Sequence, residues 1–163
     1  MRSGLLCALL GAVHFALIPH LVFSDGEPPV DGFVVDVPEG DAITVQGRRE
    51  RVSVRLSDID APELNQPFGG ESRESLAALA LGRNVQCVER GRDRFGRPAS
   101  RCKLNDVDVS AEQVRRGMAW FFARYRNDDR LRQLEGEARS ERRGLWKDRR
   151  AVPPWMWSRA SSP

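Results

Sequence analysis

The chain has 163 residues, of which 30% are charged and 40% hydrophobic, and its formal net charge is +3. This length suffices for one domain and excludes two ordinary ones. The small net charge conceals an asymmetry: residues 25–80 hold 12 acidic and 5 basic side chains, whereas residues 81–163 hold 11 acidic and 20 basic ones. An acidic half joined to an arginine-rich half suggests a cation site beside a surface for a polyanion, although ordinary solvated charge is the alternative.

The first 24 residues have the pattern of a secretory signal peptide. Arg2 precedes the apolar run of residues 4–23, and a small residue, Ser24, closes an acceptable cleavage site. An uncleaved N-terminal anchor is the alternative, because the run is nearly long enough to span a bilayer. Two histidines and a proline inside the run weaken a spanning helix and favour cleavage. In either case we expect the rest of the chain to be exported, secreted or periplasmic.

Three segments that follow read as β-strands, because they are rich in β-branched residues and are separated by turn-like sequences. The third alternates clearly, with Val52, Val54 and Leu56 on one face and polar residues on the other. We expect these strands at residues 32–37, 42–46 and 51–59.

A helix and a hairpin come next. Strong helix formers predict a helix over residues 71–82, which ends at a glycine. Residues 84–90 and 99–104 read as two strands around a loop that contains Gly96.

Cys87 and Cys102 remain once the leader is removed, an even number that favours a disulfide in an exported domain. They are placed symmetrically about residues 91–98. If that segment connects an antiparallel hairpin, the two cysteines face each other across it. A zinc site is not indicated, because the sequence has neither a CxxC motif nor a nearby histidine.

Ser110 and Gln113 resemble a capping box at the start of a short helix that ends at Gly117. The apolar residues 118–125 read as either a short strand or a connection.

Asn127 or Asp128 is expected to cap the last helix, which closes at Gly144. One stripe of this helix is apolar and comprises Leu131, Leu134 and Ala138. Two prolines and a serine-rich end predict a loose segment from Lys147, with residues 151–163 as a flexible tail.

This order of elements predicts an α+β, mainly β, fold. A five-stranded OB-fold barrel with three packed helices accounts for it, in one domain that spans residues 25–150.

Carboxylates gather at two strand ends. They are Glu39 and Asp41 at one end, and Asp58, Asp60 and Glu63 at the other. If the strands are neighbours, Asp41 and Asp60 converge. Ca²⁺ prefers several oxygen ligands, so two carboxylates, the Ala61 carbonyl and waters would form an open site. The alternative is local structure: residues 60–63 also fit a helix N-terminus with an aspartate cap.

Arginines are the second component of the pattern. Arg55 stands on the polar face of the third strand, and Arg94 and Arg97 lie in the glycine-bearing loop. Guanidinium groups match phosphate oxygens and stabilise charge that develops on a phosphoryl group. The alternative is that these arginines only face water.

Together these residues resemble the staphylococcal nuclease (thermonuclease) family. The segment VRLSDIDAPE at residues 54–63 is similar to the family's R-L-x-x-[IV]-D-[AT]-P-E motif, which is the most specific of the matches. EGDAITV corresponds to its DGDT-type turn, and DRFGR corresponds to its D-[KR]-[YF]-G-R loop. QVRRGMAW and ARSERRGLW complete five motifs in the family order, from about Gly32 to Trp146.

The resemblance implies an OB-fold endonuclease that hydrolyses DNA and RNA with Ca²⁺ and leaves 3′-phosphates. It assigns Asp41, Asp60 and the Ala61 carbonyl to the metal. It assigns Glu63 to the attacking water, and Arg55 and Arg97 to the scissile phosphate. Arg94 stands at a position that helps to hold a terminal phosphate.

Three departures from the family pattern affect groups that support the site. Glu39 replaces a supporting aspartate, Ala42 replaces a threonine hydroxyl, and Phe95 stands where some members have tyrosine. The lysine-bearing loop of some members is reduced to residues 64–70. We expect activity, at a lower level.

Trp120 and Tyr125 are candidates for stacking on unpaired bases, with packing as the alternative, so single-stranded or melted substrate is expected. The protein is expected to act as a monomer. Two other functions stay open: a non-catalytic nucleic-acid-binding OB module, and an exported interaction domain that Ca²⁺ stabilises.

Overall fold

The computed structural model describes residues 30–93, 95–122 and 128–160. Its strands are β1 (Val30–Glu39), β2 (Ala42–Gln46), β3 (Arg51–Leu56), β4 (Ile59–Asp60), β5 (Asn84–Arg92), β6 (Pro98–Leu104), β7 (Val107–Asp108) and β8 (Trp120–Phe121). Its helices are α1 (Gly69–Ala80), α2 (Val109–Arg115), α3 (Asp129–Ser140), the 3₁₀-helix η1 (Gly144–Lys147) and α4 (Pro154–Ala160).

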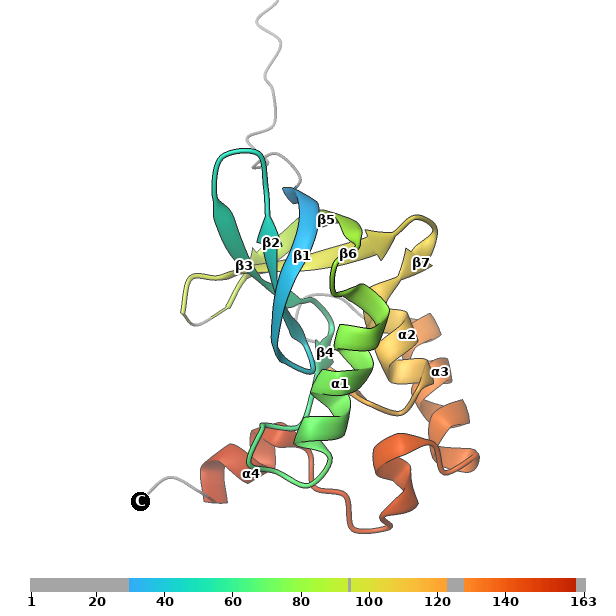
Figure 1. Cartoon of the computed structure of the whole chain (residues 1–163). Helices are drawn as coiled ribbons and strands as arrows, with labels where there is room; N and C mark the ends of the chain where they lie inside the picture. The colour runs from blue at the N-terminus through green and yellow to red at the C-terminus, as the bar shows by residue number, and fades with distance from the viewer. Residues whose placement is uncertain (1–29, 94, 123–127, 161–163) are drawn as a thin grey trace, which may run out of the picture.

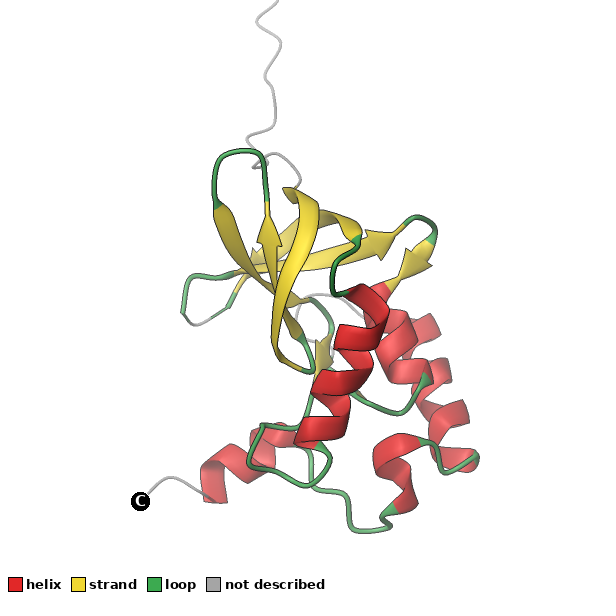
Figure 2. Cartoon of the chain, viewed as in Figure 1, coloured by secondary structure: helices red, strands yellow, loops and turns green. Residues whose placement is uncertain are grey.

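Five strands close into a barrel, as predicted. Antiparallel pairing runs in the order β3-β2-β1-β5-β6, and a parallel pairing between β3 and β6 closes the ring. Figure 2 shows this β layer at one end of the molecule and the helices at the other. The arrangement agrees with the OB-fold expectation, with β7, β8, η1 and α4 in addition.

The core lies inside the barrel and extends under the helices. Ile43 of β2 is buried there. Val54 and Leu56 of β3 are buried with it, in accord with the predicted alternation of β3. Helices α1 and α2 pack on the barrel strands, and α3 packs on α2 (Figure 1). They contribute Leu76 from α1, Val109 and Val114 from α2, and Leu131 from α3.

The predicted hairpin is β5–β6, and a disulfide links Cys87 to Cys102. The two cysteines are direct partners in the register of the hairpin, and both side chains are fully buried. The symmetric placement read from the sequence therefore corresponds to a cross-strand pair.

The start of α2 differs from the prediction. The cap is Asp108, whose side chain accepts a hydrogen bond from the Ala111 amide, so the expected capping box of Ser110 and Gln113 is wrong. Ser110 lies inside the helix and donates from its hydroxyl to the Ser57 carbonyl. Gln113 likewise bonds to Gly40 and to Ser72 and Ser75 of α1, so both polar side chains have long-range partners instead of local ones.

The C-terminal end also differs. Asp128 caps α3 as expected. The segment predicted as a flexible tail, residues 151–163, instead contains helix α4 at Pro154–Ala160. The reason is packing: Trp155 stacks on Phe122, with ring centroids 5.1 Å apart, and thereby joins α4 to the rest of the domain.

Among the described residues, no helix is both long and apolar enough to cross a membrane. The expected signal peptide, residues 1–24, lies outside the described part of the chain.

The disulfide yields a prediction about stability. Replacing Cys87 and Cys102 together by alanine should lower the free energy of unfolding by about 3 kcal/mol, because the bond closes a loop with a sequence separation of 15 residues. Urea denaturation with and without a reductant measures this. The wild type should shift on reduction and the double variant should not; a wild type insensitive to reductant would contradict the bond.

Candidate active site

Two turns that are distant in sequence meet at one end of the barrel. Gly40 sits in the β1–β2 turn so close to its neighbours that a Cβ there would lie 1.9 Å from Ser72 Oγ and 2.9 Å from the Ala61 side chain. This contact brings Asp41 next to the β4 strand end. The Ala61 amide donates to Asp41 Oδ2 at 2.7 Å. A glycine at residue 40 is therefore what lets the two acidic segments touch.

Arg55 joins the carboxylates of the two turns. It lies on β3 opposite Ala42 of β2, and its Nη2 is 2.9 Å from Asp41 Oδ2 and also donates to Asp60 Oδ1. Asp41 is 2% exposed and Asp60 is partly exposed. The structure thus brings together Asp41, Asp60 and Arg55, and Ala61 contacts the same group through its amide.

Burial, and then the charges of neighbouring carboxylates, act against the charged forms of both aspartates. Burial is the largest cause that raises the pKa of Asp41 to about 7, with Asp60 and Glu39 adding to the rise and Arg55 opposing it. Burial, and then the charge of Glu63, likewise raise the pKa of Asp60. The site therefore concentrates more negative charge than its guanidinium offsets.

The same field acts on Arg55. Burial works to lower its pKa, but the charges of Asp41, Asp60, Glu39 and Glu63 overcome this, and the pKa of Arg55 is raised. Glu39 and Glu63 are each half-buried. Four carboxylates from the predicted set thus raise the pKa of one guanidinium, and two of them, Asp41 and Asp60, contact it.

Arg97 lies directly before β6. Its described interactions include no contact with Asp41 or Asp60. Its Nε donates to Asp93 Oδ2 at 2.7 Å, and its guanidinium lies over the Phe95 ring, 5.6 Å from the ring centre. The register pairs Arg55 with Ala99, so Arg97 is two residues before the partner of Arg55. Arg97 therefore lies in the loop directly before β6, the strand that closes the barrel against β3.

Three other sequence expectations have different outcomes. Trp120 is 4% exposed and packs edge-on against Trp146, with centroids 5.4 Å apart, so the packing alternative is confirmed for it and base stacking is wrong. Arg94 and Tyr125 lie outside the described residues. The alternative that residues 60–63 start a helix is also wrong, because α1 begins at Gly69.

The described residues contain no group of three or more histidines, cysteines, aspartates or glutamates arranged to hold a metal. The two carboxylates that do converge, Asp41 and Asp60, are the metal-ligating candidates in this part of the structure. Their oxygens are donors of the type that hard divalent cations prefer.

Gln113 is a supporting residue that sequence reasoning missed. It is fully buried, and its Nε2 donates to the Gly40 carbonyl at 2.9 Å and to the Ser72 carbonyl at 3.1 Å, while Ser75 donates to its Oε1 at 2.8 Å. It thereby fastens the turn that carries Asp41 to helix α1. The sequence pattern could have indicated this residue. Gln113 lies one helical turn after Val109, on the face of α2 where an apolar residue is expected.

Comparison with known proteins adds a second line of support. Residues 53–148 match the protein family described as staphylococcal nuclease homologue. The chain belongs to the staphylococcal nuclease family. This membership confirms the family and the enzyme class predicted from the sequence, a hydrolase that acts on phosphodiester bonds.

Bacterial relatives of this nuclease cover most of its length. A protein named micrococcal nuclease, from Shigella flexneri, is 40% identical over 143 residues, which is 80% of this chain and 81% of the relative. An Escherichia coli protein named ParB is 40% identical over 159 residues, 90% of this chain and 89% of the relative. An uncharacterized endonuclease from Escherichia coli O157:H7 is 40% identical over 129 residues, 78% and 84% of the two chains.

The family match includes Arg55, Asp60, Glu63 and Arg97 but begins after Asp41. Tertiary contacts with Arg55 and with the Ala61 amide connect Asp41 to the matched segment.

The role of Gln113 yields a prediction. Gln113→Leu should lower the free energy of unfolding by about 2–4 kcal/mol, because it removes the side-chain donor to the buried Gly40 carbonyl and the acceptor of the Ser75 hydroxyl. Urea denaturation measures this. Gln133→Leu is the matched control, since Gln133 is exposed on α3, and it should change stability by less than about 0.5 kcal/mol. Equal stabilities of the two variants would contradict the fastening.

Proposed function

We propose that this nuclease is a Ca²⁺-dependent endonuclease that hydrolyses phosphodiester bonds of DNA and RNA and leaves 3′-phosphates. One observation carries the proposal: Asp41 and Asp60, from two separate turns, both contact Arg55. The charge of Glu63 also acts on Arg55 and contributes to its raised pKa. A binding module would gain nothing from burying carboxylates that repel its polyanionic ligand.

The site suits a divalent cation. Asp41, Asp60 and the Ala61 carbonyl are the proposed ligands, and Glu39 would support them from the edge. Burial, with the charges of Asp60 and Glu39 adding to it, raises the pKa of Asp41, and a bound cation would offset this cost of the ionised carboxylate. When bound, Ca²⁺ supplies positive charge to a non-bridging phosphate oxygen and polarises water.

The protein's own residues perform the remaining work. Glu63 accepts the proton of the attacking water or orients it. Arg55 and Arg97 donate to the phosphate oxygens and stabilise the charge that grows there in the transition state. Arg97 is already oriented by Asp93 and by the Phe95 ring, so little freedom is lost when phosphate binds. Arg94 and Tyr125 are proposed to contact the flanking phosphate and base.

The place of action is also a proposal. The apolar run that follows Arg2 supports export to the periplasm or the medium, and a Cys87–Cys102 disulfide persists in such an oxidising compartment. Melted or single-stranded nucleic acid is the proposed substrate form, cleaved by a monomer.

Loss of catalytic groups should abolish cleavage. The purified protein should degrade denatured DNA with Ca²⁺ and stop when a chelator removes the metal. Glu63→Gln and Arg97→Gln should each lower kcat by at least about 100-fold, because they remove proton transfer and charge stabilisation in the transition state.

Gln133→Leu should cleave like the wild type, and thermal melting should show every variant folded. Salt-sensitive binding of DNA without cleavage, at any metal concentration, would instead establish the non-catalytic module.

The raised pKa of Asp41 predicts how pH affects stability. Without metal, the folded protein keeps a proton on this carboxyl that the unfolded chain releases from about pH 4, so the free energy of unfolding should fall as pH rises from about 4 to about 7. Ca²⁺ needs the ionised carboxylate, so its stabilising shift in Tm should be large near pH 8 and small near pH 5.5.

Thermal melting over this pH range, with and without Ca²⁺, measures both effects. Asp41→Asn is the control and should lose the pH slope and the Ca²⁺ shift together. A Ca²⁺ shift of equal size at both pH values, or one retained in Asp41→Asn, would contradict the assigned site.

A further inference from the structure

The connection that carries Glu63 from β4 to α1 is short and folds back on itself. The Gln66 amide donates to the Glu63 carbonyl at 2.8 Å, and the Gly69 amide donates to the Gln66 carbonyl at 2.9 Å. A Cβ at Gly69 would lie 2.1 Å from the Glu63 carbonyl oxygen, so the start of α1 packs directly on this backbone. The position of Glu63 therefore depends on how firmly residues 64–68 are held.

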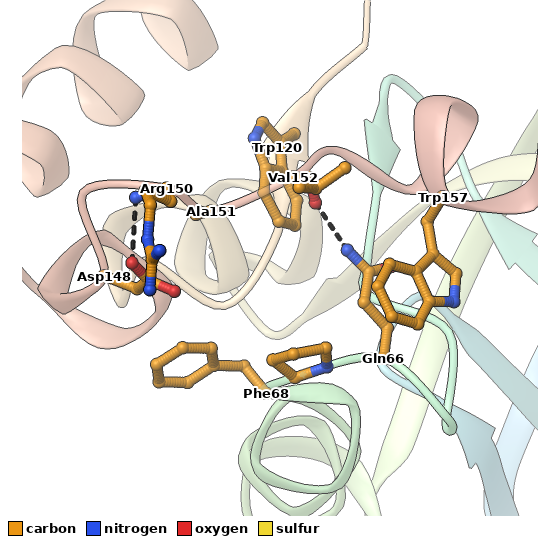
Figure 3. A pocket seen from close by; sticks show the side chains of 9 residues that line it. Gln66, Phe68, Trp120, Asp148, Arg150, Ala151, Val152 and Trp157 are labelled. Carbon is orange, nitrogen blue, oxygen red and sulfur yellow. Dashed lines mark hydrogen bonds between the residues drawn. The ribbon is translucent and has the colours of Figure 1, made fainter. Parts of the chain in front are cut away.

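The Gln66 side chain holds this connection from the other side. It is 6% exposed, although Leu64 and Asn65 just before it are exposed. Its Oε1 accepts from the Glu63 amide at 3.3 Å, and its Nε2 donates to the Val152 carbonyl. Figure 3 shows the side chain pointing toward Val152, with Trp157 beside it. One amide group thus links the backbone of Glu63 to the C-terminal segment.

That C-terminal segment is itself anchored to the active-site end of the domain. Trp155 of α4 contacts Trp120, with ring centroids 6.5 Å apart, and stacks on Phe122. Trp120 belongs to β8, where it pairs with Asp60 of β4. The Trp157 indole also donates to Asn65 Oδ1 at 3.4 Å. In Figure 1, α4 lies next to the connection that precedes α1.

We propose that residues 151–157 brace the Glu63 connection through Gln66, which makes Gln66 a positioning residue for the reaction. This inference rests on the proposed function, in which Glu63 handles the attacking water. A general base must sit within hydrogen-bond reach of that water, and misplacement by about 1 Å costs up to about 100-fold in rate. A connection with few anchors samples such displacements, and the brace restricts them.

Steady-state kinetics on denatured DNA with Ca²⁺ test the brace in the full chain. Gln66→Ala should lower kcat by about 10- to 100-fold and change KM by less than about twofold, because substrate contacts are untouched. Trp155→Ala removes the anchor of α4 and should lower kcat in the same way. Gln133→Ala is the matched control, since this exposed glutamine bonds only within α3 among its described contacts, and it should behave as the wild type.

A double-mutant cycle separates positioning from general damage. In the Glu63→Gln background, Gln66→Ala should lower kcat by less than about twofold further, because the group that it positions is already gone. Wild-type kcat in Gln66→Ala, a loss confined to KM, or the full further loss in the double variant would overturn the inference.

Hydrogen exchange of the folded protein gives a readout that does not depend on activity. Amides of residues 61–68 should exchange at least about tenfold faster in Gln66→Ala than in Gln133→Ala, and unchanged exchange would overturn the brace. If the wild type does not cleave, or Glu63→Gln cleaves fully, the proposed function has failed. In that case exchange alone decides whether the C-terminal segment holds the connection.

Discussion

The ion pairs of Arg55 with Asp41 and Asp60 are the interactions on which the site depends. The two aspartates lie in a partly buried place, where desolvation and the charges of neighbouring carboxylates raise the pKa of each. The Arg55 guanidinium forms ion pairs with both carboxylates and stabilises their ionised forms. Removing it would leave uncompensated buried charge. Because Glu39 and Glu63 act on the same guanidinium, a surplus of negative charge remains. That surplus is what a bound cation would neutralise.

Closure of the barrel brings the acidic half of the sequence into contact with the basic half. The acidic half contributes β1–β4, and the basic half contributes β5 and β6. The parallel pairing of Arg55 with Ala99 joins the two halves at Arg55, and the loop of Arg97 leads directly into the paired strand β6. A polyanion bound there meets cationic side chains from a segment other than the one that supplies the acids.

Two buried glutamines fix the backbone under the acidic residues. Gln113 holds the Gly40 carbonyl and thereby the turn of Asp41, and Gln66 holds the Glu63 amide. An amide side chain suits this task, because it donates and accepts at once and carries no charge that would perturb the carboxylates. Each glutamine also reaches a second element, α1 for Gln113 and the C-terminal segment for Gln66. Polar contacts in the interior therefore orient the charged groups of the site.

Local pattern by itself determined the strands around Val54 and Leu56, the hairpin with its facing Cys87 and Cys102, and the chain positions of the acids and arginines. These features depend on residue periodicity, turn residues and spacing, which neighbouring residues specify. Only the tertiary structure decided that Asp41 reaches Ala61, that Trp120 is buried, and that Asp108 rather than Ser110 caps α2. The docking of α4 and the link from Gln66 to Val152 belong to the same class. These features depend on contacts between segments that are far apart in the chain. Such contacts form according to how the barrel closes and which side chains fill the space that remains. No short stretch of sequence encodes either of these.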